Sequence, residues 1–247
     1  MTSRLRKTCG LALALTLGVA VAAPTGSSTT PRPPSWILRG AYAPTIDPAD
    51  FVRVVDNRYF PLKPGTSFRY RGVRDGVAQT DDVVVTRRVK YVLGVRCTVV
   101  RDTVSERGKP LELTFDWYAQ DKRGNVWYMG EDAFDRKNGR FVRASDSWQA
   151  GVHGAKPGII MQGQPRAGAV YRQEYYPPDA LDQGRVLGHP TSLHVPAGTF
   201  SRPLATIEWS PVEPQLEKKY YVAGVGEVKE EVVAGGHERF ELVRVRR

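Results

Sequence analysis

The sequence predicts an all-β fold, namely an antiparallel meander of about ten strands that forms a half-barrel, a barrel or a sandwich. Two observations support this prediction. Short runs of β-branched and aromatic residues fill residues 63–247 and are interrupted about every 8–12 residues by turn sequences. Residues 111–120 alternate strictly between apolar and polar side chains, which is the two-residue period of a strand. A helical period is not sustained anywhere over about three turns, which excludes the helical fold classes.

The alternating strand also predicts which side chains share a face. Leu113, Phe115 and Trp117 lie on one face, and Asp116 and Tyr118 lie on the other. We expect the apolar face to pack on the core and the other to be a polar face of the sheet. At residues 138–139 the dipeptide Asn-Gly predicts a two-residue hairpin, because both residues tolerate positive φ.

The N-terminal residues have the three parts of a secretory signal: a basic segment, an apolar run at residues 11–21, and a small-residue cleavage site. We therefore expect a signal peptide at residues 1–22, a leader rich in Pro, Ser and Thr at 23–49, and a single β domain at 50–247. The apolar run is too short to span a bilayer, and no later run approaches that length. These features predict an exported protein, periplasmic or secreted, that does not span the membrane.

Charge and cysteine content limit the partners. The chain carries 36 Lys+Arg against 26 Asp+Glu, which makes an anionic envelope surface a candidate partner. Nucleic acid is not expected, because basic residues are scattered among acidic ones without a basic, aromatic patch. Cys97 is the only cysteine after the signal, and its strand-like setting predicts a small core residue.

Several familiar chemistries have no motif here. The sequence lacks a nucleophile elbow, a phosphate-binding loop, a dinucleotide fingerprint and a His-Glu-x-x-His zinc motif. We therefore expect no cofactor and no metal. Whether the chain is an enzyme stays open. The candidate catalytic residues are the carboxylates Asp116, Glu131 and Glu174, with His153 as a partner, since paired carboxylates can act as general acid and base.

Aromatic residues indicate a binding site more clearly than the carboxylates do. Adjacent aromatic residues in a strand point to opposite faces, so some of them must line a second surface. The strand with Asp116 should pair with the strand at residues 126–129, and the Gly- and Pro-rich segment 148–168 is long enough to act as a lid. The predicted ligand-binding residues are Asp116, Tyr118, Trp127, Tyr128, Glu131 and Trp148.

Three functions remain open from the sequence. The first is a binding module whose β cavity or cleft holds an apolar or amphipathic small molecule or a lipid-like ligand. The second is an exported enzyme with carboxylate acid–base chemistry. The third is an envelope scaffold or assembly factor, which an exposed apolar patch would favour.

Two short segments resemble signatures of exported bacterial β proteins, which are uncharacterised and lipoprotein-like. Residues 195–200 (VPAGTF) resemble a hairpin of that group, and residues 221–229 (YVAGVGEVK) resemble its YAxGVGxVK strand pair. Residues 57–66 resemble its entry strand. The resemblance covers about a sixth of the chain and implies a curved antiparallel sheet and bacterial export. It carries no catalytic residues. The chain departs from the lipoprotein members because Cys9 precedes the apolar run, where a lipidated cysteine would follow it.

Overall fold

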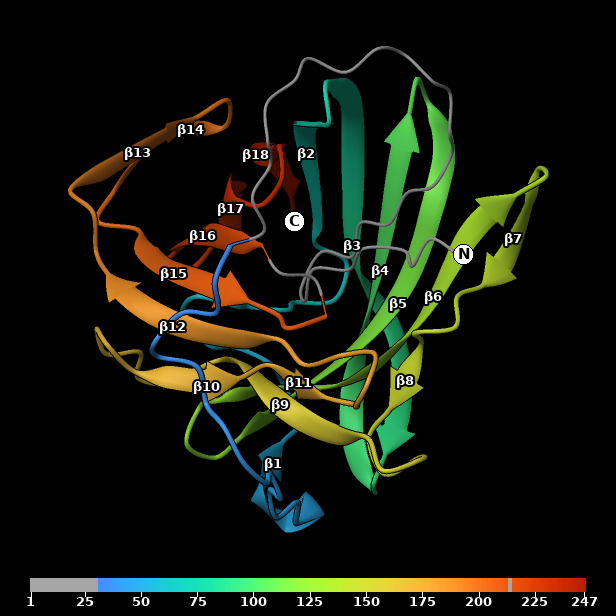
Figure 1. The fold of residues 1–247 in the computed structure, drawn as a ribbon, viewed down its shortest axis with the longest axis vertical. Coiled ribbons are helices and arrows are strands. Elements are labelled where there is room, and N and C mark those ends of the chain that lie inside the picture. The colour runs from blue at the N-terminus through green and yellow to red at the C-terminus, as the bar shows by residue number, and fades with distance from the viewer. Residues whose placement is uncertain (1–30, 213–214) are drawn as a thin grey trace.

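The computed structural model of the chain describes residues 31–212 and 215–247. The expected signal peptide at 1–22 and the start of the leader lie outside the described residues. Within them there is no α-helix, and the only helical element is a 3-10 turn, η1 (Pro48–Asp50). All other regular structure is β-strand, which confirms the predicted all-β class (Figure 1).

The described residues form eighteen strands, against about ten expected, because several ladders are only two to four residues long. The strands are β1 (Phe51–Val52), β2 (Ser67–Arg74), β3 (Val77–Val92), β4 (Val95–Glu106), β5 (Lys109–Asp121), β6 (Val126–Lys137), β7 (Arg140–Arg143), β8 (Trp148–Gln149), β9 (Lys156–Met161), β10 (Val170–Arg172), β11 (Glu174–Tyr175), β12 (Gln183–Gly188), β13 (Ser192–Val195), β14 (Gly198–Ser201), β15 (Leu204–Trp209), β16 (Leu216–Val222), β17 (Gly226–Ala234) and β18 (Glu238–Arg246).

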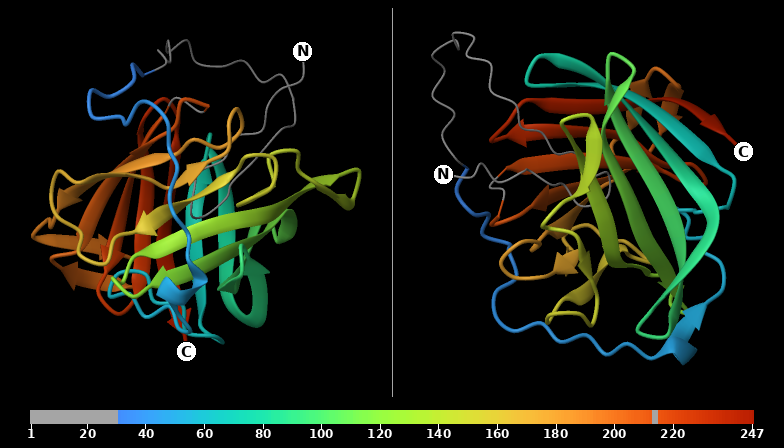
Figure 2. Two further views of the ribbon diagram at one scale, coloured as in Figure 1. Left: turned by 90° about the horizontal axis from the view of Figure 1, so that it is seen from below. Right: turned by 90° about the vertical axis from the view of Figure 1, so that its right-hand side faces the viewer.

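Two meanders join into one antiparallel sheet. Strands β2 to β6 follow each other in space as in sequence, and so do β15 to β18. Pairing of β18 with β2 connects the two meanders. The sheet then curls until β9 at one end contacts β10 at the other, so that it nearly closes into a barrel (Figures 1 and 2). The hairpin of β13 and β14, which contains the VPAGTF segment, forms a separate two-stranded sheet.

Turn chemistry sets the registers as the sequence predicts. In the β6–β7 hairpin, Asn138 and Gly139 have φ of 51° and 79°, and Lys137 pairs with Arg140 around them. This confirms the expected two-residue turn, in which both central residues take the left-handed conformation that Asn and Gly tolerate best.

The alternating strand is confirmed, but its faces are reversed from the expected arrangement. Asp116 and Tyr118 are buried and face the interior of the curled sheet, whereas Phe115, on the opposite face, is only partly buried. Arg88 lies over the Phe115 ring at 5.4 Å, and Lys90 lies over the Trp117 ring at 3.3 Å. The apolar outer face is therefore covered by long basic side chains, and the polar face lines the inside.

The segment 148–168 also differs from its prediction as an irregular lid. Residues 148–149 form β8, and residues 156–161 form β9, which pairs with β6 and β11. Gly158 permits the neighbouring chain to approach β9 closely, because a Cβ at this position would lie 2.3 Å from the backbone of Gln173, just before β11. His153 occupies an exposed turn between the two strands, with φ of 51°.

The described part of the leader, residues 31–49, runs in irregular conformation along the sheet. The Leu38 amide donates to Gln183 at 2.6 Å, and the Tyr42 hydroxyl donates to the Pro157 carbonyl at 3.0 Å. The Lys156 ammonium donates to the Tyr42 carbonyl. These contacts fasten the segment to β9 and β12.

Candidate functional site

A pocket opens into the interior of the sheet between β2, β3, β4, β5 and β17. It encloses about 460 Å³, part of which is open to solvent. Aromatic and aliphatic side chains form most of its wall, and three carboxyl groups face it. The lining residues are Phe60, Pro61, Leu62, Phe68, Tyr70, Val83, Val100, Asp102, Asp116, Tyr118, Gly226 and Glu227.

The interior changes from apolar to acidic along the strands. On β3 the inward positions run from Val83 to Asp81, and on β4 they run from Val100 to Asp102. On β5, Asp116 lies directly across from Val100. The acidic end lies toward the turns that connect β2 with β3 and β4 with β5. The pocket therefore sits at the boundary of the two zones, where a single molecule can meet both.

Asp81 and Asp102 form a buried carboxyl pair beside this pocket, with 0% and 2% of their surfaces exposed. The two groups are close enough to hydrogen-bond through a shared proton. Burial raises the pKa of both carboxyl groups well above the usual range, and the charge of Asp81 raises the pKa of Asp102 further. Both carboxyl groups therefore keep their protons to a higher pH than an isolated aspartate does.

A second carboxyl pair meets on the neighbouring hairpin. The Tyr128 hydroxyl lies 2.7 Å from Asp116 Oδ1 and 3.0 Å from Glu131 Oε2. A phenol carries a single hydrogen, so it can donate fully to only one of these carboxylates at a time. Asp116 and Glu131 are directly opposite each other in the β5–β6 ladder, which is the pairing that the sequence predicts.

An aromatic row continues from the pocket past this pair. Phe60 contacts Tyr118 with ring centroids 5.2 Å apart, Tyr118 stacks on Tyr128 at 5.0 Å, and Tyr128 meets the Trp148 ring edge-on at 5.3 Å. Each spacing lies in the range that favours aromatic pairs. The row fixes the positions of Tyr118 and Tyr128 beside the carboxylates.

A further acidic cluster lies in the interior wall formed by β15 to β18. The Lys219 ammonium, fully buried, is 3.2 Å from Glu208, 3.3 Å from Glu217 and 3.8 Å from Glu230. Burial raises the pKa of Glu208 to about 7, and the charge of Lys219 opposes that shift. Four charged groups are therefore enclosed together, with only one positive charge among them.

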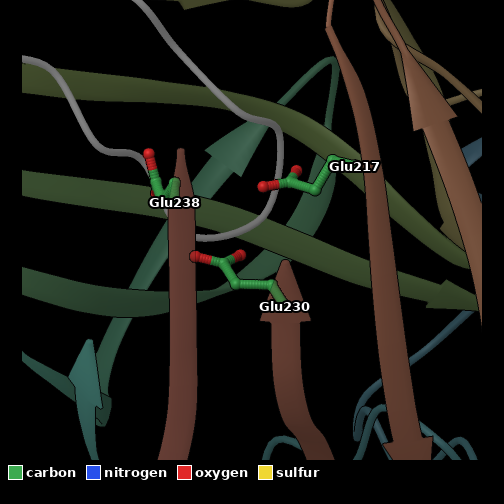
Figure 3. Close-up of side chains that lie close together, drawn as sticks. All are labelled: Glu217, Glu230 and Glu238. Atoms are coloured by element: carbon green, nitrogen blue, oxygen red, sulfur yellow. The ribbon is translucent and has the colours of Figure 1, made fainter. Parts of the chain in front are cut away.

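Glu217, Glu230 and Glu238 point toward a common space from three adjacent strands (Figure 3). One carboxylate oxygen of each lies within 4.8 Å of the others, a spacing that could hold a cation. Arg74 already binds Glu238 through two hydrogen bonds of 2.7 and 3.0 Å, and Lys219 contacts the other two glutamates. We assign this cluster as an ion-pair network of the sheet wall.

The structure brings together five of the six predicted ligand-binding residues, namely Asp116, Tyr118, Tyr128, Glu131 and Trp148. The sixth, Trp127, lies on the opposite face of β6. There its indole nitrogen donates to Asp121 at 3.0 Å, and its ring packs edge-on against Phe51. The alternation of side chains along a strand accounts for this, since neighbours of Tyr128 must point outward.

Two of the candidate catalytic residues lie apart from the pocket. His153 is exposed in the turn between β8 and β9. Glu174 is buried in β11, where it pairs with Pro157 of β9. Neither residue lines the pocket, whereas Asp116 does and Glu131 adjoins it through Tyr128.

Sequence reasoning missed Asp81, Asp102, Lys219 and Glu227. A usable signal was present in the strand parity. Asp102 has the same parity as Val100 and Val104, and all three are buried. A charged residue at a position flanked two residues away by buried valines must face the same interior as they do.

Fold and site together define a class of protein: a curled antiparallel sheet with an interior that is apolar at one end and acidic at the other. The chain matches no family model, and no curated protein matches it. Two solved structures are similar. One, from Bacteroides fragilis, is described as a "putative exported protein with YmcC-like fold". Its sequence is 14% identical, the alignment covers 77% of this chain and 100% of that chain, and the TM-score is 0.47. The other, a "putative lipoprotein" from Parabacteroides distasonis, has 13% identity, the same coverage and a TM-score of 0.41. Identities this low do not transfer a function.

Among residues 31–212 and 215–247, no helix has the length and hydropathy needed to cross a membrane.

Proposed function

We propose that this chain is a binding protein that holds an amphipathic small molecule in the interior pocket of its curled sheet. The observation that carries the proposal is the composition of the pocket: seven aromatic or aliphatic side chains and Pro61 face the same space as Asp102, Asp116 and Glu227. Small-molecule sites are largely apolar with a few polar groups that fix orientation.

A filled core is the alternative use of such side chains, and the carboxyl groups argue against it. Burying an ionisable group costs free energy unless a partner compensates it. Within the described residues, neither oxygen of Asp81 nor Oδ1 of Asp102 has a nitrogen or hydroxyl donor, and no basic side chain compensates the pair. A protein core gains nothing from such a pair, whereas a binding site can use it to recognise a polar group.

The proposal can be tested with the neutral fluorescent probe N-phenyl-1-naphthylamine, which brightens in apolar surroundings. Val100→Phe adds a ring inside the pocket, so we expect it to weaken probe binding by at least about tenfold, or about 1.4 kcal/mol. Val89→Phe is the matched control, because Val89 is 39% exposed on the neighbouring strand. Equal binding by the wild-type chain and both variants, with unchanged circular dichroism, would place the probe elsewhere.

A second candidate function is an enzyme with carboxylate acid–base chemistry. It is favoured by one observation, the meeting of Asp116 and Glu131 at the Tyr128 hydroxyl. Two carboxyl groups that share a donor can differ in protonation, which is what an acid–base pair needs. Under this function, Asp116→Asn with Glu131→Gln would accumulate an unreacted molecule in the native host. Recovery of the same bound mass from the wild type and the double variant would identify a binding protein instead.

We also propose that the chain is exported, on the strength of the three-part signal at residues 1–22. Without residues 1–22 the chain would keep 33 Lys+Arg against 26 Asp+Glu, a net charge of +7 that suits contact with an anionic envelope surface. Mass spectrometry of the protein from its native host is expected to find the N-terminus near Ala23. Recovery of the chain with Met1 intact in the cytoplasm would contradict export.

A further inference from the structure

We propose that the ligand of the interior pocket is a cationic amphiphile, an aliphatic chain bearing a protonated amine, whose amine lies beside Asp81 and Asp102. This inference rests on the proposed binding function and adds the charge of the ligand to it. Three features of the molecule support it: most buried ionisable side chains are acidic, the Asp81–Asp102 pair lacks donors, and an apolar wall lies next to that pair.

Buried charge in this protein is mostly negative, although the chain as a whole is basic. Among the described residues, the buried basic side chains are Arg74, Arg172 and Lys219. The buried acidic side chains are Asp81, Asp102, Glu112, Asp116, Asp121, Glu131, Asp135, Glu174, Asp182, Glu208, Glu217, Glu227 and Glu230. The interior thus attracts cations, and the basic residues that dominate the net charge lie mainly outside.

Each buried basic group is already engaged away from the Asp81–Asp102 pair. Arg74 binds Glu238, Lys219 contacts Glu208, and Arg172 donates to the Leu38 and Gly40 carbonyls of the leader. None of these contacts reaches Asp81 or Asp102.

The Asp81–Asp102 pair therefore has unused acceptors. Within the described chain, no nitrogen or hydroxyl donor reaches either oxygen of Asp81, and none reaches Asp102 Oδ1. The charged groups that act on Asp81 most strongly are Asp102, Glu230, Glu227 and Asp82, all of them acidic. An ammonium group supplies three donors and a positive charge, which is what these oxygens lack.

Lys219 shows how the same interior accommodates an ammonium group. Its Nζ sits among three glutamates on the opposite wall, at 3.2 to 3.8 Å, with no exposed surface. The side chain that delivers this group is itself an aliphatic stem. A ligand amine on an alkyl chain would reproduce that arrangement at the Asp81–Asp102 pair.

The apolar wall sets the rest of the ligand. Asp102 shares the pocket with Phe68, Val83 and Val100, and Phe60 and Leu62 close it on the other side. A polar group without an apolar tail would leave this surface in contact with water, whereas burying an alkyl chain against it favours binding. In an alkylamine, the ammonium group can bind the Asp81–Asp102 pair while the alkyl chain packs on the apolar wall. A fatty acid would instead bring a further negative charge to the carboxyl pair.

The experiment compares three probes with the same chain length, namely decylamine, decan-1-ol and decanoate, by displacement of N-phenyl-1-naphthylamine at pH 7. We expect decylamine to bind at least about tenfold more tightly than decan-1-ol, and decanoate to bind most weakly. Asp81→Asn with Asp102→Asn should remove the preference for the amine and leave decan-1-ol within about threefold of the wild type.

Several controls keep the outcomes separate. The double variant should fold, because replacing buried, unpaired carboxyl groups by amides relieves a desolvation cost. Glu227→Gln, on a different strand of the pocket, provides an independent second variant that should also reduce the preference. Asp82→Asn is the matched control, since Asp82 pairs with Arg69 on the exposed outer face, and we expect it to retain the preference for decylamine over decan-1-ol.

The possible failures can be told apart. Equal affinity of the wild type for decylamine and decan-1-ol would overturn the charge inference while leaving the binding function intact. Loss of the preference in Asp82→Asn, or its persistence in both the double variant and Glu227→Gln, would also overturn it. Failure of all three probes and of N-phenyl-1-naphthylamine to bind would refute the proposed function itself.

Discussion

Replacing Lys219 by Met tests whether the acidic interior depends on its single central cation. The substitution keeps an aliphatic stem of similar length and removes the charge that lies within 3.2 to 3.8 Å of Glu208, Glu217 and Glu230. Removing one partner of a buried ion pair costs about 3–5 kcal/mol, because the remaining charges stay buried without compensation. We expect a loss of that size in the free energy of unfolding at pH 8.

The loss should shrink at lower pH. Burial raises the pKa of Glu208 to about 7 even with Lys219 present, so removing the ammonium raises it further. At pH 5 Glu208 is protonated in the folded state, so the loss of the ammonium leaves less uncompensated charge and costs mainly its hydrogen bonds, at about 1–3 kcal/mol. The free energy of unfolding, measured by urea denaturation at both pH values, should therefore differ from the wild type more at pH 8 than at pH 5.

Lys218→Met is the matched control, because Lys218 precedes Lys219 on β16 and points to the other face, where it lies over the Tyr220 ring at 5.0 Å. That contact is worth about 0.5–1 kcal/mol at a partly exposed site. A Lys219→Met variant as stable as Lys218→Met at pH 8, or one with the same loss at both pH values, would refute the network as described.

Three further outcomes are expected. The wild-type free energy of unfolding should fall between pH 5 and pH 8. Burial raises the pKa of Glu208 to about 7 and that of Glu227 to about 8, so the folded chain binds more protons than the unfolded chain over this range. A free energy of unfolding that rises over this range, in a pH series of urea denaturations, would contradict the prediction. Gly72→Ala should destabilise the sheet by about 1–3 kcal/mol, because its Cβ would lie 2.5 Å from the Phe240 ring; an unchanged melting temperature would argue against that close contact. Cys97 is fully buried, and burial raises the pKa of its thiol to about 12. We therefore expect iodoacetamide at pH 8 to leave Cys97 unlabelled until urea unfolds the chain. Rapid labelling of the native protein, read by mass spectrometry, would disprove its burial.

The strands could be predicted from local chemistry, but their orientation could not. Turn residues such as Asn138-Gly139 fix where a hairpin reverses, and alternation from Leu113 to Tyr118 fixes which residues share a face. Neither feature says which face turns inward. In this chain, Lys90 and Arg88 cover the apolar face from outside, so Asp116 points into the interior, which is the reverse of the usual arrangement.

The site was predictable only where one hairpin contains it. Asp116, Tyr118, Tyr128 and Glu131 belong to adjacent strands, and their pairing follows from the short turn between them. The opposite wall of the pocket includes Glu227, which lies on β17. That strand is connected to β2 only through β18, whose pairing with β2 joins the two meanders. Such long-range closure depends on the curvature of the whole sheet, which no local pattern encodes.

A crystal structure of the protein with decylamine would test the central claim most directly, because it locates the ligand and its charged end in one measurement. We predict electron density for the alkyl chain between Phe68, Val83 and Val100, with the amine nitrogen within about 3 Å of a carboxylate oxygen of Asp81 or Asp102. A decylamine molecule bound only to the outer face of the sheet, with the interior pocket filled by ordered water, would contradict the claim.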